Sequence, residues 1–411
     1  MQHKPFPLIK NRKEAYPLMR GSSKTAYHFF DGAGGTQVPT VVQDAMVQYL
    51  SHHNSNQGGY HKTSLETDHI VDQARQKLAR LFNAKSPNEI CFGANMTSIT
   101  LNFSRCLARL WQENDEIIIS DLDHEANRSP WVSAASEKGI NVRSCQIKPQ
   151  DGTLDLDHLR KLLSPKTKLV AVTLASNLLG TFTPIKDIIE EAHKVGAFVY
   201  VDAVHAAPHC LIDVQDLNCD FLVCSPYKFF GPHLGVLWGK GSLLQEIPSY
   251  RIMPAPKEIP GKWESGTPNF EAIAGTGAAI DYLTSLCDTH QREELPSIRD
   301  AMKAIQLHEQ KISEYFLSKV SEYKNVKLFG ISDVSRAHQR TPTFSLSIDG
   351  YSPAILAQKL ADKNIYAWSG HCYAVTLSEK LGYKEGFLRV GYNQYHDLED
   401  VDLFFELIQD L

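Results

Sequence analysis

The sequence predicts an α/β protein built on a mainly parallel sheet, followed by a smaller C-terminal α+β domain. Short apolar runs alternate with helical segments through the first part of the chain, at residues 116–120, 168–174, 198–201 and 221–224. Strands that alternate with helices are typically joined by right-handed crossovers and lie parallel. Beyond residue 286 the pattern changes, and strand-like runs lie at residues 326–329, 343–348, 365–368 and 387–390. We therefore expect a large domain over residues 31–275 and a small one over 276–411, with residues 1–30 packing near the small domain.

The composition excludes several classes of function. The 411 residues carry a formal net charge of -5 and contain no concentrated run of Lys or Arg, so nucleic acid is not an expected partner. No stretch approaches 18 consecutive apolar residues, and the N-terminus lacks the apolar core of a signal peptide. The eight cysteines form no CxxC pair and no disulfide framework. We therefore expect a cytoplasmic protein with reduced thiols and no membrane association.

Helices and turns are expected around the strands. Residues 28–39, HFFDGAGGTQVP, form a glycine-rich turn, but Gln37 stands where a dinucleotide fingerprint needs glycine, and no GxxxxGK[ST] occurs. Gly32, Gly34 and Gly35 either turn the chain tightly or let its backbone approach a ligand, and the turn is favoured. Apolar periodicity and caps predict helices over residues 41–52, 67–82, 99–110, 272–286, 353–363 and 397–411.

Polar side chains follow the ends of the four predicted parallel strands. In a parallel sheet, ligands gather at the carboxyl ends of the strands. The residues at these ends are Asp123 and His124, then Ser176 and Asn177, then Asp202 and His205, and finally Lys228.

Lys228 stands alone between two apolar runs, residues 221–223 and 235–238. This position predicts a strand-to-strand turn with a buried lysine stem, and burial lowers the pKa of a lysine and makes it a nucleophile. A single loop lysine more often extends to solvent. Other residues of the sequence must therefore decide whether Lys228 is buried and reactive or extends to solvent.

Residues 89–97 supply one such companion, a short strand, a turn of small residues and the start of a helix. The free N–H groups of a helix start bind anions, although an ordinary strand-to-helix connection has the same pattern. A buried lysine, a strand-end aspartate, a histidine and an anion site are what pyridoxal 5'-phosphate (PLP) requires. A carboxylate about 4 Å from its ring nitrogen would contribute ~4 kcal/mol at an effective dielectric of 20.

Two motifs, VYVDAVHAAPH and SPYKFFGPHLGVLWG, resemble those of the class V aminotransferase family, especially its cysteine-desulfurase-like branch. The resemblance runs from FFDGAGGTQVP to RVGYNQYHDLEDVDLF. It implies a PLP-dependent transferase of fold type I, with a seven-stranded type of sheet in the large domain. It also implies a homodimer with a shared active site.

The resemblance assigns roles in the site. Lys228 would form the Schiff base, Asp202 would face the pyridine nitrogen, and His124 would stack on the cofactor ring. Asn177 would lie on the ring's hydroxyl or substrate side, and His205 would contact that hydroxyl. The implied phosphate contacts are Asn95, Met96, Thr97, Ser225 and Tyr227, with Thr267 supplied by the neighbouring subunit.

Substrate binding falls to Arg389, which would clamp the α-carboxylate through its planar guanidinium, together with Asn177 and His61. The sequence departs from the family at AWSGHCYA, where the nucleophilic cysteine position falls on Tyr373 and Cys372 stands one residue early. Neighbours on an extended segment point in opposite directions, so we expect Cys372 to face away from the substrate unless the loop bends. Cys372 is then an activated thiol or, the favoured alternative, an inert side chain, and Tyr373 a substrate-side hydroxyl or a pocket wall.

The expected function is a PLP-dependent enzyme for a small α-amino acid, of cysteine desulfurase or Cβ–S lyase type. An external aldimine would form, and Lys228 would then remove the α-proton. An amino-acid epimerase or a class V aminotransferase is the alternative, and a sulfur-acceptor protein is an expected partner. A non-enzymatic binding protein is disfavoured because Lys228, Asp202 and Arg389 are all present. The pair His205 and His209 predicts no metal, since the HExxH glutamate is missing and Pro208 breaks a helix.

Overall fold

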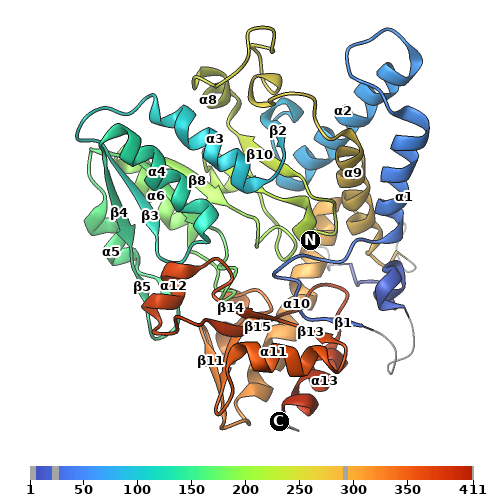
Figure 1. Cartoon of the computed structure of the whole chain (residues 1–411), viewed down its shortest axis with the longest axis vertical. Helices are drawn as coiled ribbons and strands as arrows, with labels where there is room; N and C mark the ends of the chain where they lie inside the picture. The colour runs from blue at the N-terminus through green and yellow to red at the C-terminus, as the bar shows by residue number, and fades with distance from the viewer. Residues whose placement is uncertain (1–5, 21–26, 290–294, 410–411) are drawn as a thin grey trace, which may run out of the picture.

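A computed structural model describes residues 6–20, 27–289 and 295–409. A seven-stranded sheet forms its centre (Figure 1), and β10 is antiparallel to both neighbours whereas the other paired strands are parallel. The predicted α/β fold with a mainly parallel sheet is confirmed. In sheet order the strands are β2 (Ile90–Gly93), β10 (Gly235–Gly239), β9 (Phe221–Cys224), β8 (Phe198–Asp202), β7 (Thr167–Thr173), β3 (Glu116–Ser120) and β4 (Asn141–Cys145).

Helices cover both faces of this sheet (Figure 1), which explains why both faces of its central strands carry apolar side chains. Ile117 of β3 packs in one buried cluster with Trp131, and the next residue, Ile118, packs in another with Leu78. Successive side chains of a strand point to opposite faces, so the strand supplies both cores.

The predicted helices form, with shifted ends. Residues 41–52 correspond to α1 (Thr40–Gln48) and a π-helical turn (Tyr49–His53), and α2 (Lys62–Phe82) begins earlier than the predicted residue 67 because the His61 side chain caps it. Asparagine side chains cap α3 (Met96–Ala108) and α9 (Phe270–Ser285). The remaining helices and strands of this part are α4 (Ser129–Lys138), α5 (Leu156–Leu162), α6 (Ile185–Lys194), α7 (Val214–Leu217), α8 (Gly241–Glu246), β5 (Ile147–Lys148) and β6 (Thr153–Leu154).

The C-terminal part holds a four-stranded antiparallel sheet, as an α+β arrangement requires. The prediction of one strand over residues 365–368 is wrong: β13 pairs parallel with β1 (His28–Phe29), and β14 pairs antiparallel with β15, so the chain changes partners between them. The predicted helix over 397–411 is α13, and residues 410–411 lie outside the described residues. The elements are α10 (Ile298–Val320), β11 (Val326–Phe329), β12 (Thr343–Ile348), α11 (Pro353–Ala361), β13 (Ile365–Tyr366), β14 (Trp368–Gly370), α12 (Val375–Lys380), β15 (Phe387–Gly391) and α13 (Leu398–Gln409).

The described part of the N-terminal segment contacts both halves of the chain. Arg12 donates hydrogen bonds to the Gln394 carbonyl and to Asp397, whereas the Tyr16 ring packs against Phe230, just after Lys228, with ring centroids 6.2 Å apart. The division at residues 275 and 276 stays a proposal.

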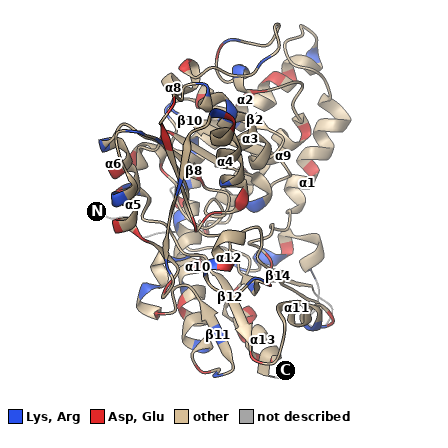
Figure 2. Ribbon diagram, turned by 60° about the vertical axis from the view of Figure 1, so that its left-hand side comes forward, with Lys and Arg blue, Asp and Glu red and all other residues tan. Residues whose placement is uncertain are grey.

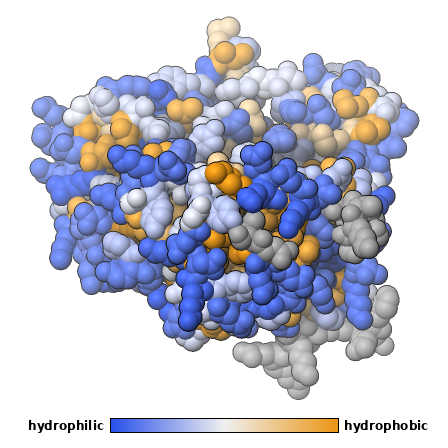
Figure 3. Space-filling view, turned by 60° about the horizontal axis from the view of Figure 1, so that its bottom comes forward, coloured by the Kyte–Doolittle hydropathy of each residue, from blue (hydrophilic) through white to orange (hydrophobic). Residues whose placement is uncertain are grey.

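Charges of both signs are interspersed over the molecule (Figure 2), and the face presented by the C-terminal part is mostly hydrophilic with small apolar groups (Figure 3). Within the residues that the structure describes, no helix is both long and apolar enough to cross a membrane.

Candidate active site

Lys228 ends a short 3-10 helix (Pro226–Lys228) in the connection between β9 and β10, the strand-to-strand turn that the sequence predicts. Its Nζ donates to the carbonyls of Ala33, at 2.5 Å, and Gly34, at 2.8 Å. A Cβ at Gly34 would lie 2.7 Å from the Trp368 indole nitrogen. The backbone of the glycine-rich turn thus contacts the lysine amine. A side chain at Gly34 would collide with Trp368 and prevent this approach.

The pKa of the Lys228 amine lies near neutral pH. Burial, followed by the Arg389 cation, lowers its pKa to about 7, although Cys372, Asp202 and Asp31 act to raise it. A lysine with this pKa is largely unprotonated just above pH 7 and is therefore a nucleophile.

Asp202, the last residue of β8, is buried within electrostatic reach of Lys228. Burial raises the pKa of Asp202 to about 6, while the Val204 N–H, which donates to its Oδ1 at 2.8 Å, and the Lys228 cation lower it. Asp202 is therefore an anion at neutral pH. Nearby Asp123 has a pKa raised by burial to about 7, and Ser120 and Asn127 donate hydrogen bonds to it.

His124 offers a neutral aromatic ring to the same site. It caps a short 3-10 helix (Glu125–Asn127), and its Nδ1 accepts the Ala126 N–H at 3.0 Å. Burial, followed by the cations of Lys228 and Arg389, lowers the pKa of His124 to about 4.

Several buried polar atoms of the site have no hydrogen-bond partner among the residues that the structure describes. Arg389 donates from Nη1 to the Asn177 carbonyl at 3.0 Å, and Asn177 donates from Nδ2 to the Cys372 carbonyl at 2.8 Å. The atoms left without partners include Arg389 Nε, Asn177 Oδ1, His205 Nδ1 and Asp31 Oδ1. Buried polar groups are normally satisfied, so these atoms fit a polar ligand.

The loop that carries Cys372 and Tyr373 bends sharply. Both residues have positive φ angles, 49° and 60°, so the alternation of an extended segment does not apply. The Cys372 thiol lies close enough to Lys228 to act on its charge. Tyr373 is 69% exposed, and its ring stacks on His124 with centroids 5.3 Å apart. The bend under which we expected Cys372 to face the site is present.

The proposed phosphate residues lie at the start of α3 and beside Lys228. The Asn95 side chain caps the helix, Thr97 is exposed, and the Met96 N–H donates to Ser225 Oγ at 3.2 Å. Ser225 thus ties the helix start to the turn of Lys228. The Tyr227 ring lies 5.0 Å from Lys228 Nζ.

Thr267 lies near the start of α3, whereas the hydrogen bonds of His61 are local. Thr267 is exposed on the wall of a pocket that also includes Gly93 and Ser98. The hydrogen bonds of the His61 side chain lie within its own segment, to Thr63 and Ser64.

The sequence prediction missed Asp31 and Thr341. Burial raises the pKa of Asp31 to about 6 although Arg389, Trp368 and Lys228 lower it, so this carboxylate faces the reactive lysine. The sequence signal for Asp31 was a polar residue directly after the apolar pair Phe29-Phe30. Thr341, which lies 3.1 Å from His205 Nε2, had no local signal because its role depends on the approach of a distant segment.

Comparison with known proteins gives a consistent result. A cysteine desulfurase of Synechococcus elongatus is 30% identical over 98% of this chain, which spans 62% of that protein's length. A probable cysteine desulfurase of Synechocystis is also 30% identical, with 98% and 93% of the two chains covered. The apo structure of a cysteine desulfurase from Thermococcus onnurineus NA1 superposes with a TM-score of 0.88 at 25% identity, covering 100% of this chain and 99% of that one. The model of the aminotransferase class-V family matches residues 28–404, and the chain is therefore an enzyme of that family.

Proposed function

We propose that this protein is a PLP-dependent enzyme that acts on a small α-amino acid, of cysteine desulfurase or Cβ–S lyase type. The observation that carries the proposal is a buried lysine, Lys228, with a pKa of about 7, surrounded by Asp202, His124 and Arg389. The relatives named cysteine desulfurase support the choice of reaction.

The residues present fit PLP. Lys228 would hold the cofactor through its amine, the Asp202 anion would keep the ring nitrogen protonated, and neutral His124 would face the ring. The start of α3 and Ser225 would bind the phosphate, since helix N-termini offer free N–H groups. When bound, PLP supplies an electron sink for bonds at the substrate α-carbon.

The remaining steps fall to side chains of this chain. Arg389 would bind the substrate carboxylate, and the amine of Lys228 would take the α-proton. In a desulfurase reaction, the Cys372 thiolate attacks the substrate sulfur as the Cβ–S bond breaks. The electron pair of that bond stays on the carbon, which becomes the methyl group of alanine after protonation, and Cys372 becomes a persulfide. The sulfur would then pass to an acceptor protein. All eight cysteines are free thiols, which fits a cytoplasmic enzyme.

Cofactor binding is tested first. Protein incubated with PLP should develop the visible absorbance of lysine-bound cofactor, and borohydride should leave a reduced adduct on the Lys228 peptide. Lys228→Ala should lose both signals. Lys262→Ala is the matched control, because Lys262 is similarly buried but donates to the Gln245 carbonyl. An adduct elsewhere, or none, would overturn the proposal.

The reaction is tested with a panel of amino acids, following sulfide, alanine, pyruvate and racemised product. Cysteine should yield alanine in the desulfurase case and pyruvate with sulfide in the lyase case. Cys372→Ala should abolish alanine and persulfide formation if Cys372 accepts the sulfur. Unchanged turnover in this variant would exclude the persulfide mechanism and leave the lyase. Racemised product or amino transfer would instead support the epimerase or aminotransferase alternative.

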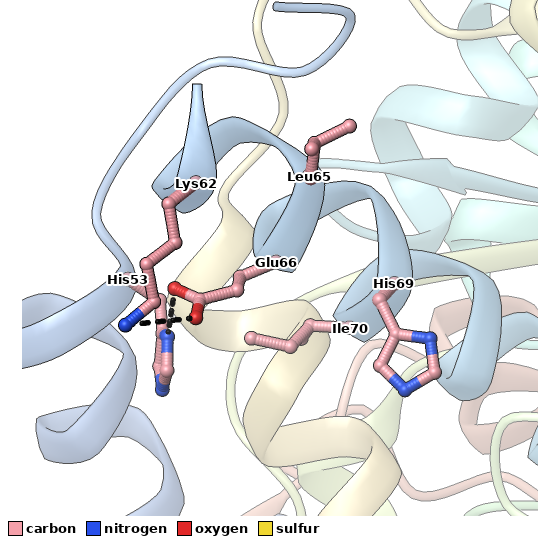
Figure 4. Close-up of a pocket in the computed structure, with 6 residues that line it drawn as sticks. All are labelled: His53, Lys62, Leu65, Glu66, His69 and Ile70. Atoms are coloured by element: carbon pink, nitrogen blue, oxygen red, sulfur yellow. Dashed lines mark hydrogen bonds and ion pairs between the residues drawn. The ribbon is translucent and has the colours of Figure 1, made fainter. Parts of the chain in front are cut away.

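We further propose a homodimer in which each chain completes its partner's site. Thr267 and His61 are both exposed in the single chain, as residues donated across an interface would be. Near His61 the surface carries a pocket in which Leu65 and Ile70 lie among polar side chains (Figure 4), with His53 and Lys62 both paired to Glu66. Leu65 on its rim is 55% exposed.

A further inference from the structure

His205 is a buried histidine whose hydrogen bonds indicate its protonated nitrogen. Its Nε2 lies 3.1 Å from Thr341 Oγ1, and the Thr341 hydroxyl has the Gly180 carbonyl as an acceptor. A hydroxyl has one hydrogen, so when Thr341 donates to Gly180, Nε2 must donate to Thr341. The opposite tautomer would bury an N–H without an acceptor at Nδ1, which is costly. Nδ1 of His205 therefore carries a free lone pair.

A second buried pair packs behind this ring. The ring of His209 lies edge-on to that of His205, with centroids 5.0 Å apart. Its Nδ1 lies 2.7 Å from Oε2 of Glu309 on α10, and the two side chains are 1% and 2% exposed. The carboxylate fixes the hydrogen of His209 on Nδ1. No step of the proposed reaction uses either residue.

The charges around His205 disfavour its protonated form. After burial, His209, Lys228 and Arg389 each lower the pKa of His205, and all three are cations when protonated. Glu309 faces His209, and burial raises the pKa of Glu309, whereas His209 and a hydrogen bond from the Gln394 backbone lower it. His209 is the member of the pair that contacts the His205 ring, and Glu309 is bonded to His209.

We propose that Glu309 and His209 are positioning residues for His205, which hold its ring neutral with Nε2 toward Thr341 and Nδ1 free to accept a hydrogen bond in the Lys228 site. The inference rests on the proposed function, because the group that would donate to His205 Nδ1 is the ring hydroxyl of PLP. Asn177 Oδ1, buried without a partner, offers a second acceptor. An acceptor at this position favours the hydroxyl in its protonated form.

The first test needs no cofactor. Full-length protein with ¹⁵N-labelled histidine is titrated by NMR, and His205→Asn assigns the His205 signals. In the parent protein His205 should stay Nε2-protonated and neutral from pH 5 to 8. His209→Asn removes a group that lowers the pKa of His205, so it should raise that pKa by about one unit. Glu309→Gln removes the carboxylate that orients His209, so it should move the proton of His205 toward Nδ1.

Glu314→Gln, on the same helix, is the matched control, because Glu314 accepts a hydrogen bond from Gln310 and not from a histidine. Thermal unfolding checks that the variants fold, and Glu309→Asp should restore the parent signals in part because it keeps the carboxylate. Unchanged His205 signals in both Glu309→Gln and His209→Asn would overturn the inference.

The second test uses the PLP-loaded protein. The ratio of the absorbance bands for the protonated and ionised ring hydroxyl should fall in Glu309→Gln, by about tenfold for one pKa unit. Failure of PLP to bind would refute the proposed function and leave the NMR result standing. Binding with unchanged bands in Glu309→Gln would refute this inference alone.

Discussion

At Lys228, two separate features lower the pKa of the amine. One is its burial, and the other is the Arg389 cation, 161 positions along the chain. Burial and Arg389 both lower its pKa, and the carboxylates of Asp202 and Asp31 compensate in part. Because the result is a pKa of about 7, small changes in this environment alter the fraction of reactive amine at neutral pH.

The rate of reaction with PLP should follow this pKa. The amine is protonated below about pH 7 and free above it, so the rate should rise through pH 7 and then level off. Arg389→Met removes a cation that lowers the pKa, so the curve should move to higher pH by roughly one unit. Stopped-flow absorbance of the apo protein from pH 5.5 to 9 measures it. Arg143→Met, which instead removes the partner of Glu116, should leave the curve in place.

Asp202→Asn keeps the shape of the side chain and removes its charge. The lost interaction with the ring nitrogen, ~4 kcal/mol at an effective dielectric of 20, predicts a fall in turnover of roughly two to three orders of magnitude. PLP content, measured after alkaline release, should change little because Lys228 still binds the cofactor. Full activity of the variant would remove Asp202 from its proposed role.

Among the elements, the turn over Lys228 shows most directly how backbone shapes the site. A Cβ at Gly32 would lie 1.5 Å from Asn393 Oδ1. The Asn393 side chain is buried, so it has no free space into which to move. The turn is therefore held between the lysine and the C-terminal part of the chain.

Gly32→Ala should destabilise the fold by about 1–3 kcal/mol, as overpacking of a buried contact does. Urea unfolding measures the change. Gly277→Ala is the control, since its Cβ would meet Ala74 at 3.6 Å, an ordinary contact, in the helix α9. Alanine favours a helix over glycine by roughly 0.5–1 kcal/mol, so this variant should be at least as stable as the parent. Equal stability of both variants would contradict the packing argument.

The loop after β14 is fixed from two sides by elements of the large sheet. Asn177, after β7, donates to the Cys372 carbonyl at 2.8 Å, and the Glu125 N–H, after β3, donates to the Tyr373 carbonyl at 2.8 Å. Two successive positive φ angles cost energy, and the contacts on both sides maintain them. The loop thereby turns Cys372 toward Lys228 and Tyr373 onto His124.

At the scale of the whole molecule, the proposed homodimer would use the surface near α1 and α2. Leu65→Asp places a charge on an exposed apolar rim and should shift the protein from dimer to monomer, seen by light scattering after size exclusion. PLP retention should fall with it, because Thr267 would then be missing from the partner's site. Ile355→Asp, at a 49% exposed position on α11, should not change the mass. A monomeric parent protein would refute the proposed dimer.

The sequence by itself determined the parallel strands, the lysine turn and the order of the polar strand ends. These follow from apolar runs and local turn chemistry, which depend on neighbours in the chain. It could also have shown α10, where Ser297 and Asp300 form a capping box before an apolar periodic run. The edge strand β4 was missed because its side chains are largely exposed and lack that pattern.

Only the tertiary structure decided which strand-end residues meet and how they are charged. Asp31 and Thr341 act on the site across separations of more than a hundred residues, and the pKa of Lys228 depends on burial that no local pattern measures. The direction of Cys372 likewise required the bend that Asn177 and Glu125 impose. Long-range packing sets electrostatics and side-chain direction, whereas the local sequence sets the elements that carry them.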